Sequence, residues 1–256
     1  MEIFSNYDPW ILGLLCLTGF VAGGINTMAG GGSNLTLPVL MMLGLPADIA
    51  NGTNRVGVLL QCVVSVRGFD RYKTLDRPAI KPILVPTLLG GLCGSLVAAL
   101  LPGLYLKPLL LGTILTMSVI ILVKPGTIAP PTGSEVLSPR DSRAAWLGLF
   151  GAGVYGGFVQ AGVGFILLAA LAGGLRYDLL RANALKTVCA LAFTCVAVVI
   201  FILFDQIWWV PGLVLAAGTM LGAHLAVKVA VNVPQSYLKW FLFLMTVAAC
   251  VGGFLY

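Results

Sequence analysis

Residues 23–34 read Gly-Gly-Ile-Asn-Thr-Met-Ala-Gly-Gly-Gly-Ser-Asn and interrupt a long apolar stretch near the start of the chain. Glycines this dense hold a regular helix poorly, because glycine loses the most backbone freedom when it is ordered. Apolar segments flank the interruption at 10–28 and 33–44. At membrane depth, irregular backbone is tolerated only where it lines a cavity or is buried in protein. The stretch therefore predicts a helix that is broken inside a membrane protein.

The composition of the whole chain agrees with a membrane protein. Of 256 residues, 59% are hydrophobic and only 9% are charged, whereas a soluble domain carries about 25% charged residues. So few charges cannot cover a water-facing surface of this size. The 32 glycines and 14 prolines lie within apolar runs, where small residues allow membrane helices to pack closely.

The apolar runs define the expected helical segments. They are 10–28, 33–44, 49–67, 79–101, 105–124, 143–160, 164–174, 183–204, 208–228 and 238–256. A membrane-spanning helix needs about 20 residues, so 33–44 and 164–174 are short. Each of these two follows a glycine-rich break and is either a short span or the second arm of a re-entrant hairpin.

The positive charges set the orientation. The loop 67–81 carries five basic residues and is expected in the cytoplasm. With that choice, thirteen of the fifteen Lys and Arg residues fall on the cytoplasmic side, and the Asp205 loop falls on the other. The net charge of +6 is therefore an orientation signal and not a sign of nucleic-acid binding. We expect a multi-pass protein of the bacterial cytoplasmic membrane with both termini in the periplasm.

The two halves of the chain resemble each other at an offset of 132 residues. Ala29-Gly30-x-Gly32 superposes on Ala161-Gly162-x-Gly164, and Ala50-Asn51 superposes on Ala182-Asn183. Each half has an odd number of predicted crossings, so the second copy enters the membrane upside down, as in many secondary transporters. The predicted fold is an all-α polytopic membrane protein of two inverted-topology repeats, each of about five helical segments with Gly-rich broken or re-entrant helices. The repeats are 1–124 and 143–256, joined by a cytoplasmic linker at 125–142.

The glycine-rich breaks are the first candidate site. Exposed backbone amides before a new helix form an anion-binding element, and Ser33 and Asn34 are placed to cap that helix. The alternative is tight helix packing through small residues. The first copy contributes Gly30, Gly31, Gly32, Ser33 and Asn34. The second copy is more apolar, with Gln160 as its main polar residue beside Gly162 and Gly164.

Two cations form the second candidate group. Arg55 follows Asn51, Thr53 and Asn54 and lies well inside an apolar run, where an ionisable residue indicates function and a guanidinium matches oxyanions. The alternative is that Arg55 snorkels to the membrane interface. Lys186 beside Asn183 occupies the related place in the second half, or it is an ordinary cytoplasmic charge.

Enzyme and metal chemistry find no support in the sequence. Six cysteines without a CxxC pair and a single histidine give no metal-binding pattern. No acidic residue falls in the middle of an apolar run, and no paired acid and base are present. We expect no enzyme activity, no cofactor and no metal.

The chain resembles the sulfite exporter TauE/SafE family, also called the toluene sulfonate uptake permease family. The resemblance lies in residues 19–24 leading to 29–32, in 50–54, and in their second copies at 151–165 and 182–188. It implies a transporter of sulfite or small organosulfonates. We therefore expect a secondary transporter that moves a small oxyanion by alternating access, in the export direction, using the two candidate groups above. A channel-like anion pore, or an uptake permease for another small sulfur compound or anion, remains the alternative.

Overall fold

A computed structural model describes residues 9–110, 112–113, 136–139 and 142–232. This part of the chain folds into helices and contains no strand. The helices are α1 (Pro9–Met28), α2 (Ser33–Met42), α3 (Ala47–Arg71), α4 (Arg77–Leu100), α6 (Arg143–Phe158), α7 (Val163–Leu168), the π-helical turns η3 (Ala169–Gly174), α8 (Leu179–Leu203) and α9 (Trp209–Asn232). Four of them, α1, α4, α8 and α9, are long and apolar enough to cross a membrane. The prediction of an all-α membrane protein is confirmed.

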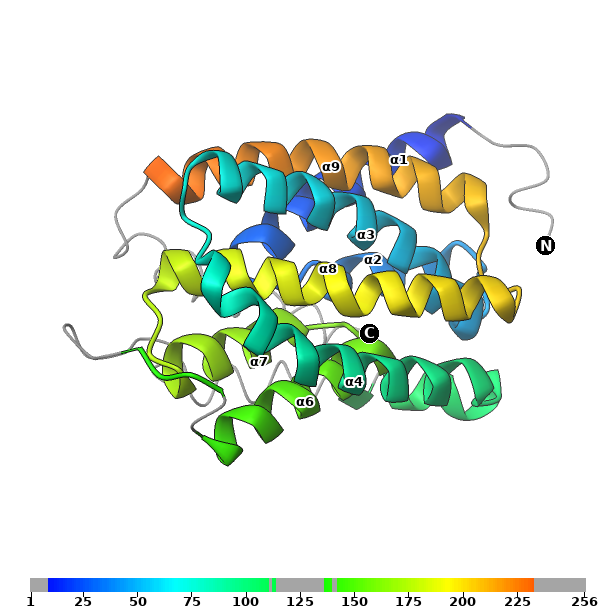
Figure 1. Cartoon of the computed structure of the whole chain (residues 1–256). Coiled ribbons are helices and arrows are strands. Elements are labelled where there is room, and N and C mark those ends of the chain that lie inside the picture. Colours follow the sequence, from blue (N-terminus) through cyan, green and yellow to red (C-terminus); the bar gives the residue numbers. More distant parts are fainter. Residues whose placement is uncertain (1–8, 111, 114–135, 140–141, 233–256) are drawn as a thin grey trace.

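The long helices form two groups that meet where α3 packs against α8 (Figure 1). One group contains α1, α2, α3 and α9, and the other contains α4, α6, α7 and α8. Each group therefore takes one long helix from the other half of the sequence. The sequence division into 1–124 and 143–256 remains a prediction, and the helix packing shows that those two stretches interlock.

Glycines allow the helices of each group to approach backbone to backbone. A Cβ added to Gly218 would lie 2.0 Å from the carbonyl oxygen of Cys16, where α1 meets α9. A Cβ added to Gly94 would lie 2.0 Å from the carbonyl oxygen of Val154, where α4 meets α6. Close approach through small residues is the usual way that helices associate in lipid.

The contact pairs also give the direction of each helix. Cys16 faces Gly218 and Phe20 faces Gly222, so α1 and α9 run the same way. Gly57 and Gly68 meet Leu215 and Val227, so α3 runs with them. By the same reasoning α4 runs with α6, because Gly90 meets Phe150 and Gly94 meets Val154.

These directions settle how the short helices lie. Since α1 and α3 run the same way, α2 brings the chain back, and α1 with α2 forms a helical hairpin. The segment α7–η3 does the same between α6 and α8, since α6 runs with α4 and α4 runs with α8. Gly91 of α4 meets Phe193 of α8, and Ala99 at the end of α4 accepts a hydrogen bond from Gln206 just beyond α8. We call the end where α3 passes into α4 the basic-loop end, and the end where α8 passes into α9 the Asp205 end (Figure 1).

Backbone details recur at the offset of 132 residues. The bounds of α3 and α4 shifted by 132 are those of α8 and α9. Positive φ angles pair in the same way: Gly30 with Gly162, Gly44 with Arg176, and Lys73 with Asp205. These coincidences, together with the opposite directions of α3 and α8, support the inverted-repeat interpretation. Most of the predicted linker and the last predicted segment lie outside the described residues.

Candidate functional site

The two helix breaks cross each other between the two groups. Gly30 has a φ of 92°, and a Cβ added to it would lie 2.2 Å from the Cα of Gly164. The amide of Gly164 donates a hydrogen bond to the carbonyl of Gly30 at 3.3 Å. Gly162, with a φ of 72°, begins α7. Glycine is required at this crossing because any side chain would drive the two backbones apart.

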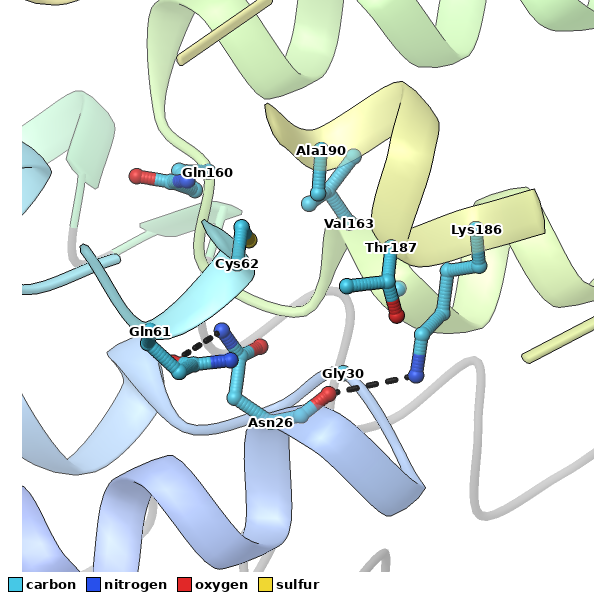
Figure 2. A pocket seen from close by; sticks show the side chains of 10 residues that line it. Asn26, Gly30, Gln61, Cys62, Gln160, Val163, Lys186, Thr187 and Ala190 are labelled. Atoms are coloured by element: carbon cyan, nitrogen blue, oxygen red, sulfur yellow. Dashed lines mark hydrogen bonds between the residues drawn. The ribbon is translucent and has the colours of Figure 1, made fainter. Parts of the chain in front are cut away.

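A narrow hollow of about 10 Å³ lies beside the crossing. Such a volume has room for about one water molecule. Its lining comes from both breaks and from α3 and α8 (Figure 2). The lining residues are Asn26, Gly30, Gln61, Cys62, Gln160, Val163, Gly164, Lys186, Thr187 and Ala190. None of them is acidic.

Lys186 reaches from α8 across this hollow to the end of α1 (Figure 2). Its ammonium donates to the carbonyls of Asn26 at 3.1 Å and Thr27 at 3.0 Å, and to Oδ1 of Asn183 at 2.8 Å. These carbonyls belong to the last turn of α1, where a cation is favoured by the helix dipole. Since Lys186 is only 2% exposed, it is not a cytoplasmic surface charge.

Arg55 makes the corresponding contacts with the last turn of α6. Its guanidinium, fully buried, donates to the carbonyls of Gly156, Gly157 (2.8 Å) and Phe158 (3.2 Å), in the last turn of that helix. Asn51 also donates to the Phe158 carbonyl, at 3.0 Å, and the guanidinium lies 5.5 Å from the centre of the Phe201 ring. Arg55 therefore does not snorkel to the interface, and it does not line the hollow.

Together, the two cations form what we call the reciprocal caps. Lys186 of the second half holds the broken helix α1 of the first half, and Arg55 of the first half holds the broken helix α6 of the second. Each cation lies beside the asparagine predicted for it: Arg55 is 3.4 Å from Asn51, and Lys186 is 2.8 Å from Asn183. Both caps join one group of helices to the other.

Neither buried cation has a carboxylate partner. The ion pairs among the described residues are Arg77–Asp70 and Arg181–Asp178, and the side chains of both pairs are well exposed. Burying a charge in a low-dielectric interior is costly unless an opposite charge or enough dipoles compensate it. Among the described residues, carbonyl and amide oxygens surround both charges, and the Phe201 ring lies beside Arg55. A buried cation without a carboxylate partner favours a bound anion.

The first break presents backbone amides but no side-chain cap. The N-cap of α2 is Gly32, and no side chain caps it, so the expected capping by Ser33 or Asn34 is wrong. Among the described residues, the amides of Gly31, Gly32 and Ser33 have no hydrogen-bond acceptor. Both side-chain amide atoms of Asn34 are also buried without a partner. This arrangement is suited to holding an anion at a helix N-terminus.

Two predicted site residues are engaged in structural contacts instead. Asn54 accepts a hydrogen bond from Thr36 at 2.6 Å and donates to Ser33 at 3.1 Å, so it ties α2 to α3. Thr53 accepts from the amide of Trp208 at 3.0 Å. Neither residue lines the hollow.

Several pocket residues were not singled out from the sequence. Asn26 donates to Gln61 at 3.0 Å, and Cys62 and Thr187 lie close by (Figure 2). Asn26 and Gln61 are polar residues within apolar runs. That position marks them as site candidates, because intramembrane polar groups usually face the protein interior. The predicted Gln160 does line the hollow: its amide donates to Thr194 at 2.9 Å, and its Oε1 is buried without a partner.

A bundle of apolar helices around crossed, broken segments with buried cations defines an α-helical membrane protein of the transporter class. The sequence profile described as "Sulfite exporter TauE/SafE" matches residues 15–252, so the chain belongs to the TauE/SafE family of membrane transporters.

Curated relatives agree with this assignment. A "Probable membrane transporter protein" of Haemophilus influenzae is 30% identical over 242 residues, which cover 92% of this chain and 91% of that protein. "Probable membrane transporter protein YfcA" of Escherichia coli K12 is 25% identical over 93% of this chain and 89% of its own length. "Probable membrane transporter protein ORF9" of a Sinorhizobium species is 24% identical over 94% of this chain and 91% of its own length.

Proposed function

We propose that this protein is a secondary transporter that exports a small oxyanion, such as sulfite or an organosulfonate, across the bacterial cytoplasmic membrane by alternating access. The observation that carries this proposal is the presence of two fully buried cations, Arg55 and Lys186, with no carboxylate partner among the described residues. The family name supports a sulfur oxyanion as the substrate class.

The hollow offers the chemistry that a small anion needs. Lys186 supplies a charge, and the side-chain amides of Asn26 and Gln61 supply hydrogen-bond donors from two other elements. Hydrogen bonds to a charged group are stronger than those between neutral groups. No acidic side chain lines the hollow, so no full negative charge in the lining repels an anion.

The reciprocal caps couple binding to movement in this proposal. An anion that reaches the Lys186 ammonium competes with the carbonyls of Asn26 and Thr27 for the same donor. Such competition weakens the hold of α8 on α1, and the two groups of helices are then free to shift about the crossing of Gly30 and Gly164. The moving bodies are the two packed groups, since each contains a helix from the other half of the sequence.

The direction of transport follows from charge. An inside-negative membrane potential drives an anion outward by about 2.3 kcal/mol per charge per 100 mV. Exposed basic side chains gather at the basic-loop end, including Arg71, Lys73 and Arg77, and these attract anions toward that end. With the basic-loop end in the cytoplasm, as the positive-inside rule predicts, both effects favour export.

The test is sulfite flux from liposomes that contain the purified protein. Lys186→Met is expected to lower the flux at least tenfold, while Lys186→Arg keeps part of it because the charge is retained. The matched control is Lys81→Met, which removes an exposed lysine from α4 and is expected to change the flux less than twofold. Wild-type flux in Lys186→Met would refute the proposed site. Ion currents far above carrier turnover would identify an anion pore instead.

A further inference from the structure

A second hollow, separate from the first, lies between α3 and α9 at the basic-loop end. Its volume is about 260 Å³. Its floor consists of Val64, Gly68 and Val227. A Cβ added to Gly68 would lie 2.9 Å from Val227, so the two helices touch at this level and the hollow is a cleft that opens outward. We call it the α3–α9 cleft.

The rim of this cleft carries four basic side chains. Arg67 and Arg71 come from α3, and His224 and Lys228 come from α9. In each pair the residues are four apart, which places them on one face of their helix. The two basic faces are thus turned toward the same cleft from opposite sides.

Among the described residues, no acidic side chain lines this cleft. The carboxylate nearest along the chain, Asp70, is bound by Arg77 through hydrogen bonds of 2.9 and 3.0 Å. Asp70 does not line the cleft. The rim therefore presents basic side chains to a cleft that no carboxylate lines.

The surroundings of the cleft are apolar. On α9, Leu221 is 61% exposed, Leu225 is 49% exposed and Val229 is 46% exposed. In a membrane protein such a helix face contacts lipid tails. Tyr72, 41% exposed, lines the cleft at its polar end, where aromatic side chains commonly sit at the headgroup level.

We propose that the α3–α9 cleft binds the phosphate of an anionic membrane lipid, with the headgroup between the two basic faces and the acyl chains along the exposed face of α9. Basic pockets between membrane helices on the cytoplasmic side are suited to anionic headgroups. A free phosphate ion shares the charge chemistry but makes no use of the neighbouring apolar face. This proposal does not depend on the transported substrate.

The experiment titrates the full-length protein in detergent with phosphatidylglycerol and measures bound lipid by native mass spectrometry and thermal unfolding. Phosphatidylglycerol is expected to remain bound and to raise the Tm, whereas zwitterionic phosphatidylcholine is not. The variant Arg71→Gln/Lys228→Gln is expected to bind phosphatidylglycerol about 25-fold more weakly, since each basic residue near an anionic lipid surface contributes about fivefold. Both residues are exposed, so the variant keeps the core intact.

The matched control is Lys73→Gln/Lys81→Gln, which removes the same charge from exposed positions outside the cleft. It is expected to bind phosphatidylglycerol within threefold of the wild type. Equal losses of affinity for phosphatidylglycerol in both double variants would show that the lipid binds through general surface charge. That result would overturn the proposal. An equal rise in Tm with inorganic phosphate alone would overturn the assignment to a lipid.

Discussion

Replacing Gly30 by alanine tests the crossing of the two helix breaks. Gly30 has a φ of 92°, which costs an L-residue about 1–2 kcal/mol. The new Cβ would lie 2.2 Å from the Cα of Gly164, so the two backbones must part by more than about 1 Å to restore ordinary contact. Overpacking of this kind costs a further 1–3 kcal/mol or so. The expected total is about 2–5 kcal/mol.

Thermal unfolding of the purified protein and sulfite flux in liposomes measure the effect of Gly30→Ala. The Tm is expected to fall by several degrees and the flux to drop at least tenfold, because the crossing is also the point about which we propose that the two groups of helices move. Gly148→Ala is the matched control: Gly148 lies in α6 with nothing within 4 Å of an added Cβ, and alanine there is expected to stabilise the helix by up to about 1 kcal/mol. If Gly30→Ala has the wild-type Tm and flux, the crossing does not constrain the protein as argued here.

Three further predictions follow from the contacts described above. Arg55→Met leaves the last carbonyls of α6 without their donor and is expected to destabilise the protein by about 1–3 kcal/mol; an unchanged Tm would rule out the cap. Asn54→Ala removes the hydrogen bonds to Thr36 and Ser33 and is expected to cost about 2–4 kcal/mol, whereas Asn232→Ala at the exposed end of α9 is expected to cost less than about 0.5 kcal/mol. Cysteines introduced at Lys73 and Asp205 are expected to react with a membrane-impermeant maleimide from opposite sides of the membrane, and labelling of both from one side would contradict the proposed topology.

Much of the local architecture was predictable because its signals are local. Each apolar run matches a helix to within a few residues among the described segments, and the glycine-rich breaks end α1 at Met28 and α6 at Phe158. Glycine weakens a helix and readily takes a positive φ, and Gly30 and Gly162 take that conformation in the two breaks. The offset of 132 residues equates Asn51 with Asn183, and the sequence placed one cation near each of them, Arg55 and Lys186; the structure shows the contacts.

The partners of those cations depended on long-range packing. Arg55 looked suited to an oxyanion, but in the structure its donors meet the carbonyls of Gly157 and Phe158, about 100 positions away. Likewise, no local feature of the sequence shows that α4 packs against α6 and α8, or that α9 packs against α1 and α3.

Composition, periodicity and repetition thus determined that this chain is an α-helical membrane protein and predicted two broken helices, but they left open whether Arg55 and Lys186 are buried. Only the tertiary structure decided that each cation caps the broken helix of the other half, and that Asn26, Gln61 and Lys186 surround one hollow. The physical reason is that whether a segment forms a membrane helix depends on the free energy of transferring that segment from water into lipid. The partner of a buried polar group depends instead on which backbone dipoles distant packing places within about 3 Å of it.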